Sequence, residues 1–268
     1  MKKILIPLTI LISLVSIWGC NSDTVDKNTQ IKSLDDAREI SINKKKLEEL
    51  SDKLSGYWLS DPYLINIEST KSIYDSRDYT TSMFGFILKK EEMMKNKAIL
   101  QGFSSHEGGA EALLSYNPDK NIFENSINTG ESYYFKKPFT LRVLDDQHLE
   151  LSFPDKKERY RKVVDEADEL RRLVLAGKYR DILSDTKIDF KRDGYVTGIP
   201  EYNFYEMYYD FGEGLWMDAV FFYHTDEKIE QGIYHYKIKN DTIRMYQVKG
   251  ELPDYSLGEL KYELVRVE

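Results

Sequence analysis

Cysteine is nearly absent from this chain, because Cys20 is the only one in 268 residues. The residues that follow it contain no thiol, which excludes disulfide bonds and cysteine nucleophiles from the rest of the chain. We therefore expect the folded part to be stabilised by the packing of apolar side chains.

Positive charge is also in short supply, with 38 Lys and Arg against 46 Asp and Glu and a net charge of −8. Removal of residues 1–19 would take away two lysines and no acids, which changes −8 to −10. Nucleic-acid binding depends on clustered positive charge. The composition therefore argues against a nucleic-acid partner and against adhesion to anionic lipid head groups.

Only one long apolar run is present, from Ile4 to Trp18, and it follows two lysines. A membrane-spanning helix needs about 20 consecutive apolar residues, and this run is shorter and contains Pro7. A charged start with a short apolar stretch is typical of a secretory signal peptide. We predict that residues 1–19 are cleaved on export.

The run ends in Ile17-Trp18-Gly19-Cys20, which resembles the lipobox of bacterial lipoproteins. Trp18 departs from the usual small residue there, and the alternative is an ordinary signal beside an incidental cysteine. The resemblance implies lipidation of Cys20 by diacylglycerol and an acyl chain such as palmitate, each buried methylene contributing about 0.8 kcal/mol. Since Asn21 is not the Asp that retains some lipoproteins at the inner membrane, it also implies the outer membrane, on the periplasmic or the surface face.

The remaining chain divides by composition into a tether and two larger segments. Residues 20–32 are polar and predict a flexible tether to the lipid. Residues 33–163 begin with a charged stretch that favours one or two short amphipathic helices, and strand patterns follow. Residues 164–268 repeat this order, with a helix over about 163–175.

Alternating apolar residues and recurrent turn signals predict many short antiparallel strands after Gly56. Asp61-Pro62 is one of these turn signals. The order helix end, Gly, one residue, aromatic occurs at Leu54–Trp58 and again 121 residues later at Leu175–Tyr179. The predicted fold class is mainly β: two small antiparallel β-barrels or sandwiches in tandem, each preceded by a short helix.

Gly56-Tyr57-Trp58 at the start of a small antiparallel domain resembles the lipocalin-like, or calycin, families. The resemblance implies an eight-stranded barrel with Trp58 closing one end. Gly177-Lys178-Tyr179 matches with Tyr in place of Trp. The alternative is that Gly56 only ends a helix and Trp58 is an ordinary core residue. An eight-stranded barrel is either filled by side chains or holds one small ligand.

No catalytic or metal-binding motif is complete, so we expect no catalytic residue, no metal and no cofactor. His106-Glu107-Gly108-Gly109-Ala110 begins like a zinc-protease motif but has Ala110 at the second ligand position, and its glycines disfavour a helix. Ser105 beside His106 does not make a catalytic triad. His224 and His235 flank a predicted turn without a third ligand.

Aromatic side chains are densest between residues 202 and 216. As a strand, this segment would place Tyr202, Phe204 and Tyr208 on one face and Tyr205 on the other. We expect one face to be core and the other to be covered by the adjoining half or by a ligand. The candidate ligand-binding residues are Tyr202, Phe204, Tyr205, Tyr208 and Trp216, with Tyr205 taken as pointing outward.

These patterns together predict a membrane-anchored, exported binding or scaffold lipoprotein without enzymatic activity. Its partner is the membrane through Cys20, together with a small apolar ligand, a glycan or a protein. The alternatives are a cell-envelope hydrolase that uses Ser105, His106 or carboxylates that the sequence does not place, and an inhibitor or immunity-type protein.

The lipid anchor makes a direct prediction for Cys20→Ser. We expect the variant to be released from membranes by a salt wash, because it has no acyl chains, whereas the wild type needs detergent. Labelled palmitate should enter the wild type alone. Equal fractionation of the two proteins, with no label in either, would contradict lipidation of Cys20.

Overall fold

The computed structural model covers most of the chain after the expected signal peptide. Residues 1–19 and Cys20, the predicted site of lipidation, lie outside the described residues. Residues 43–268 form one compact unit that contains two antiparallel sheets. Within the described part of the chain, no helix is both long and apolar enough to cross a membrane. The described residues are 27–95, 97–106, 108–125, 135, 137–224, 231–251 and 254–267.

A single helix, α1, spans Lys27–Leu54. It is longer than the one or two short helices predicted from residue 33, and it takes in residues 27–32 of the predicted tether. This stretch contains no Gly or Pro, which are the residues that most disfavour a helix. Leu47, Leu50 and Leu54 recur at helical spacing and are buried in the core of the first sheet.

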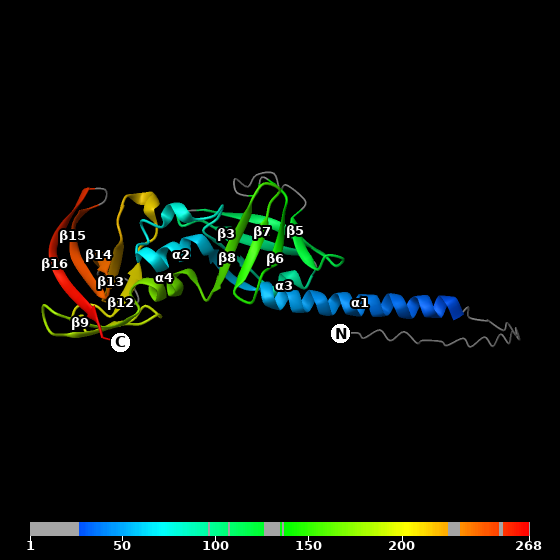
Figure 1. Ribbon diagram of the computed structural model, residues 1–268, viewed down its shortest axis with the longest axis horizontal. Coiled ribbons are helices and arrows are strands. Elements are labelled where there is room, and N and C mark those ends of the chain that lie inside the picture. Colours follow the sequence, from blue (N-terminus) through cyan, green and yellow to red (C-terminus); the bar gives the residue numbers. More distant parts are fainter. Residues whose placement is uncertain are drawn as a thin grey trace, which may run out of the picture. The chain divides into compact units, whose positions relative to one another are not determined.

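The first sheet is a closed eight-stranded barrel, as the strand pattern predicted. Its strands follow one another in chain order, and β8 returns to pair with β1 (Figure 1). Fully buried side chains such as Trp58, Phe86 and Tyr160 pack in its core. The strands are β1 Gly56–Ser60, β2 Gly85–Leu88, β3 Lys97–Phe103, β4 Gly109–Asn117, β5 Ile122–Asn125, β6 Phe139–Val143, β7 His148–Ser152 and β8 Lys157–Val163.

The second sheet also has eight strands, in the order β11-β10-β9-β16-β15-β14-β13-β12. Here β9 pairs with β16 just as β1 pairs with β8. An isolated bridge between Tyr195 and Phe204 links the two outer strands. The strands are β9 Gly177–Asp181, β10 Lys187–Phe190, β11 Val196–Thr197, β12 Phe204–Met207, β13 Ala219–Tyr223, β14 Gln231–Lys239, β15 Thr242–Glu251 and β16 Asp254–Arg266.

In both sheets, the pair formed by the first and the last strand places a cation over an aromatic ring. Trp58 lies opposite Lys162, whose Nζ is 5.4 Å from the centre of the indole ring. Tyr179 lies opposite Arg266, whose Cζ is 5.0 Å from the phenol ring centre. The preceding glycine has positive φ in both places, 124° at Gly56 and 148° at residue 177. Only glycine adopts such angles without strain.

Five short helical segments connect or cover the strands in the described part of the chain. Helix α4 confirms the helix predicted over 163–175, and the Asp165 side chain accepts a hydrogen bond from the Asp168 N–H as its N-cap. The predicted turn at Asp61-Pro62 is wrong, because these residues begin a helix, where Pro fits the first turn. The segments are α2 Asp61–Thr70, η1 Arg77–Tyr79, α3 Lys90–Met93, α4 Glu166–Val174 and η2 Phe211–Glu213.

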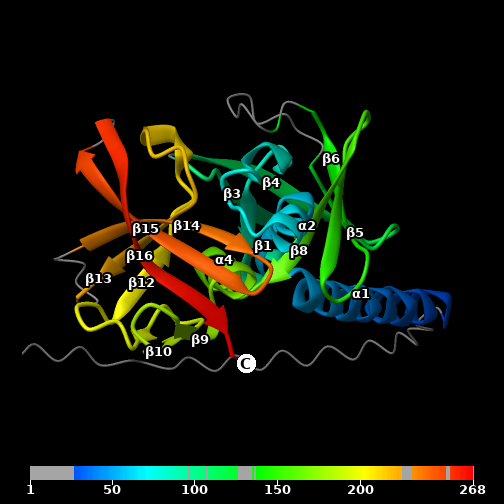
Figure 2. The same cartoon turned by 60° about the vertical axis from the view of Figure 1, so that its left-hand side comes forward.

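Helix α2 contributes side chains to the core of the second sheet although it follows β1 in the chain. Tyr63, Leu64 and Ile67 are buried in the same apolar cluster as Phe222 and Tyr236. The helix contacts α4, and the two are seen close together in Figures 1 and 2. A fragment that began at residue 164 would lack these α2 side chains.

Ion pairs join α2 both to strand β8 and to helix α4. The Asp61 carboxylate is almost fully buried and lies 2.8 Å from the Arg161 guanidinium of β8. Arg161 also contacts Glu68 of α2 at 2.7 Å, and Glu68 lies 3.6 Å from Arg172 of α4. A buried carboxylate needs such pairing, because removal of its partner would leave an uncompensated charge.

Two adjacent residues of α2 test its place in the core. We expect Leu64→Ala to reduce the free energy of unfolding by about 2–5 kcal/mol, because it leaves a cavity among fully buried side chains. Ile65 is 51% exposed, so Ile65→Ala should change the free energy by less than about 0.5 kcal/mol. Urea denaturation of both variants measures the difference. Equal, small losses would place α2 outside the core.

Candidate functional site

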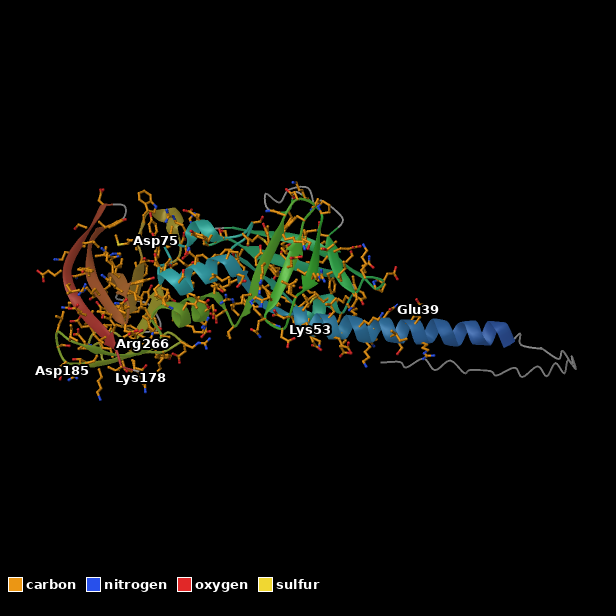
Figure 3. All side chains as sticks on the ribbon, viewed as in Figure 1. Glu39, Lys53, Asp75, Lys178, Asp185 and Arg266 are labelled. Atoms are coloured by element: carbon orange, nitrogen blue, oxygen red, sulfur yellow. The ribbon has the colours of Figure 1, made fainter. Side chains whose placement is uncertain are left out.

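A groove of about 750 Å³ lies against the second sheet. Its walls come from three parts of the chain: the segment 70–75 after α2, residues 216–218 before β13, and the strands β14 and β15. Figure 3 labels Asp75 in the first of these segments. Its volume is within the range of about 300–1,000 Å³ that is usual for small-ligand sites.

Asp218 joins two walls of the groove. Its carboxylate accepts hydrogen bonds from the Ser72 hydroxyl at 2.6 Å, the Tyr74 N–H at 2.9 Å and the Tyr236 hydroxyl at 3.3 Å. Burial raises the pKa of Asp218 above its ordinary value, and these hydrogen bonds oppose that effect. With three donors on its two oxygens, Asp218 fixes the segment 70–75 to the second sheet.

His235 of β14 is a neutral side chain in the groove wall. Its Nδ1 lies 2.7 Å from the Asp218 carbonyl oxygen, so Nδ1 carries the proton and donates it. Burial lowers the pKa of His235, and the charge of Lys237 lowers it further, while Asp218 opposes both. Its ring lies 6.3 Å from that of Tyr246, the residue opposite on β15.

Two cations face each other across β14 and β15. Lys237 lies directly opposite Arg244 in the register, and like charges in this position repel. Glu263 of β16 lies 2.6 Å from Arg244 and neutralises it. Lys237 is exposed and forms no ion pair with any residue that the structure describes. Lys71 and Lys239 add further positive charge to the groove lining, whose only acids are Asp75 and Asp218.

Trp216 lies on the groove with 60% of its surface exposed. Its indole N–H donates to the Phe211 carbonyl at 3.2 Å, and its backbone N–H donates to the Tyr255 hydroxyl at 3.2 Å. Both N–H groups are therefore used inside the protein, and the exposed surface is mainly the apolar ring. Sequence reasoning singled out Trp216, and the structure places it in the groove.

The other aromatic candidates do not line this groove. The prediction that Tyr205 points outward is wrong: its exposure is 0%, and its hydroxyl donates to the Lys191 carbonyl at 2.8 Å inside the core. Tyr202 stacks on Phe222, and Tyr208 stacks on Phe221. Phe204 packs on Tyr195 with ring centres 4.0 Å apart. The predicted alternation of faces holds over Phe204–Met207, where Tyr205 is buried and Phe204 is only half-buried. It does not extend to Tyr202, which packs against the same core as Tyr205.

The predicted strand over residues 202–211 is also shorter than expected. Only Phe204–Met207 is strand, and the chain then turns through η2, which Asp210 starts by accepting a hydrogen bond from the Gly212 N–H. This turn brings Trp216 to the groove. Sequence reasoning missed Ser72, Asp75, Asp218 and Lys237, because their proximity depends on the packing of α2.

The structure describes part of the incomplete catalytic motifs. Gly109 begins strand β4 rather than a helix, as the glycines predicted. His106 has its Nδ1 2.7 Å from the Asp210 carboxylate, whereas the Ser104 hydroxyl donates to the His106 carbonyl. Glu107 lies outside the described residues.

His224 and His235, which flank the turn predicted from the sequence, contact different backbone carbonyls. His224 contacts the Glu201 carbonyl, and His235 contacts the Asp218 carbonyl. Among the residues whose positions are described, no group of three or more His, Cys, Asp or Glu side chains could hold a metal ion.

Comparisons with family models, with curated proteins and with solved structures found no match to this chain. The groove itself therefore carries the functional argument. It is lined by the exposed indole ring of Trp216, by Lys237, which has no ion-pair partner among the described residues, and by Asp218, whose hydrogen bonds join two of its walls. Its volume is that of a small-ligand site.

Protonation of His235 makes the stability of the protein depend on pH. Since its folded pKa is lowered, the unfolded state binds the extra proton first, and stability falls as the pH drops below the unfolded value of about 6.5. Between pH 7 and pH 5, we expect His235→Gln to lose less stability than the wild type. Urea midpoints across this range measure both slopes. Parallel slopes would show that His235 is not the group responsible.

Proposed function

We propose that this protein is a lipid-anchored binding protein of the bacterial cell envelope, and that the groove beside β14 and β15 is its binding site. The observation that carries the proposal is that one groove is lined by the exposed apolar ring of Trp216 and by Lys237, which forms no ion pair within the described part of the chain. Exposed aromatic rings and unpaired charges both gain free energy when a partner covers them.

The lipid anchor at Cys20 is proposed from the sequence alone. It would hold the folded unit outside the inner membrane, on the outer membrane in our proposal, through acyl chains rather than a spanning helix. The acidic chain would gain nothing from anionic head groups. Anchoring and ligand binding are thus assigned to different parts of the chain.

We further propose that the two sheets are copies of one lipocalin-like barrel in tandem. Support comes from the shared meander order, the pairing of first and last strands, and the positive-φ glycines at 56 and 177. The cation over the aromatic ring also recurs, as Lys162 over Trp58 and Arg266 over Tyr179. Such a detail at equivalent register positions favours duplication.

The binding site we propose lies outside the strands rather than inside a barrel. Large apolar side chains fill both cores, including Phe123 and Leu141 in the first and Phe222 and Met245 in the second. An eight-stranded barrel that is filled in this way has little room for a ligand. We therefore do not favour a carrier of an apolar ligand in the barrel interior.

Neither alternative class gains specific support from the site. A hydrolase could use Asp75 and Asp218, since carboxylate pairs cleave glycosidic bonds. The carboxylate of Asp218, however, already accepts three hydrogen bonds. An inhibitor that blocks a protein through loops would need a larger contact surface than this groove, about 800 Å² on each partner.

Co-sedimentation with cell envelopes of the source bacterium tests the binding function. The soluble Cys20→Ser form should sediment with the envelopes, and Trp216→Ala or Lys237→Glu should remove most of this binding. Tyr195→Ala and Lys187→Glu are matched controls, because both residues are exposed on the same sheet and neither lines the groove. Unchanged binding by the groove variants, or equal loss in the controls, would contradict the proposal.

A further inference from the structure

We infer that the ligand of the groove is an acidic sugar chain, with a sugar ring against Trp216 and an anionic substituent on Lys237. This inference rests on the proposed binding function and adds the chemistry of the ligand. Three properties of the groove support it: its charge, the orientation of Trp216 and its polar rim.

The charge of the groove is opposite to that of the chain. Lys71, Lys237, Lys239 and Arg244 line it together with only two acids, in a protein whose net charge is −8. Two of these cations are already engaged, since Lys71 donates to the Leu173 carbonyl and Arg244 pairs with Glu263. Lys237 and Lys239, which form no ion pair with any described residue, are two positions apart on β14 and therefore share one face of the sheet. An anionic ligand would supply the counter-charge that Lys237 lacks among the described residues.

The ring of Trp216 offers an apolar surface at the same groove. The face of an indole carries partial negative charge from its π electrons. The C–H groups on one side of a pyranose ring carry partial positive charge and present a flat apolar face. Since both N–H groups of Trp216 are bound within the protein, this ring can stack on a sugar without losing a hydrogen bond.

Polar side chains on the rim complete the match to a sugar. Asp75 is exposed, and its carboxylate forms no ion pair with any described residue, so its oxygens can accept hydrogen bonds from sugar hydroxyls. Asn240 and Thr242, which both donate and accept, lie at the turn from β14 to β15. Sugar hydroxyls need both kinds of partner. A fatty or purely apolar ligand would leave these groups unpaired.

The groove is better suited to a chain of a few sugars than to a folded protein. Its volume of about 750 Å³ is that of a small-molecule site. An acidic peptide is the nearest competitor, because it could also satisfy Lys237. It would not explain the flat, exposed ring of Trp216 next to hydroxyl-binding groups.

Isothermal titration of the soluble Cys20→Ser protein with three probes tests the inference. The first is tetragalacturonate, the second is its methyl ester, which has the same sugars without charge, and the third is tetraglutamate, which has charge without sugar. We expect tetragalacturonate to bind at least about tenfold more tightly than either of the others. A higher sodium chloride concentration should weaken the binding of tetragalacturonate, because salt screens the contact with Lys237.

Variants of the two central residues complete the test. Trp216→Ala and Lys237→Glu should each weaken tetragalacturonate binding at least about tenfold, whereas Tyr195→Ala and Lys187→Glu should not. If tetraglutamate bound as tightly as tetragalacturonate, the assignment of the ligand as a sugar would be overturned. If the methyl ester bound as tightly, the assignment of the ligand as acidic would be overturned. If no probe binds while envelope binding still depends on Trp216, the inference fails and the proposed function stands. If neither tetragalacturonate binding nor envelope binding depends on Trp216, the inference and the proposed function both fail.

Discussion

The groove depends on one packing interaction, the burial of α2 in the core of the second sheet. Tyr63, Leu64 and Ile67 supply the apolar contact, each worth roughly 1.5–3 kcal/mol when fully buried. This burial brings the next residues of the chain, 70–75, to the edge of β13 and β14. Without it, Ser72 would not reach Asp218, and one wall of the groove would be missing.

Hydrogen bonds to Asp218 fix the position of the segment 70–75, which the apolar contact brings to the second sheet. The Asp218 carboxylate accepts hydrogen bonds from the Ser72 hydroxyl and the Tyr74 N–H, while its backbone carbonyl accepts a hydrogen bond from Nδ1 of His235. A buried polar group is stable only when its hydrogen bonds are satisfied. One residue thus ties together the segment after α2, the start of β13 and the wall formed by β14. The cations and Trp216 are held around this rigid joint, which limits the entropy lost when a ligand binds.

Local patterns in the sequence were sufficient to predict that the chain after Gly56 is mainly antiparallel strand, and to place helix α4. The Gly-x-aromatic pattern located the first strand of each half. These features depend on neighbouring residues. Helix α2 was missed because Asp61-Pro62 has the composition of a turn as well as of a helix start.

The site was predicted only in part, because tertiary packing, which local sequence patterns do not show, brings most of its residues together. Trp216 was identified, because a dense aromatic segment is visible in sequence. Tyr205 was assigned to the wrong face, since alternation separates two faces without saying which one is buried. Lys237 and Asp75 belong to segments far apart in the chain, and only tertiary packing brings them to one groove.

The two tryptophans of the chain from residue 20 onward give a direct measurement of the central claim. The indole N–H of Trp58 donates to the Leu54 carbonyl in the core, and that of Trp216 donates to the Phe211 carbonyl at the groove. In ¹H–¹⁵N spectra of the Cys20→Ser protein titrated with tetragalacturonate, we expect the Trp216 indole signal to shift and saturate. The Trp58 signal should stay in place. Saturating binding that leaves the Trp216 signal unmoved would contradict the assignment of the groove as the ligand site.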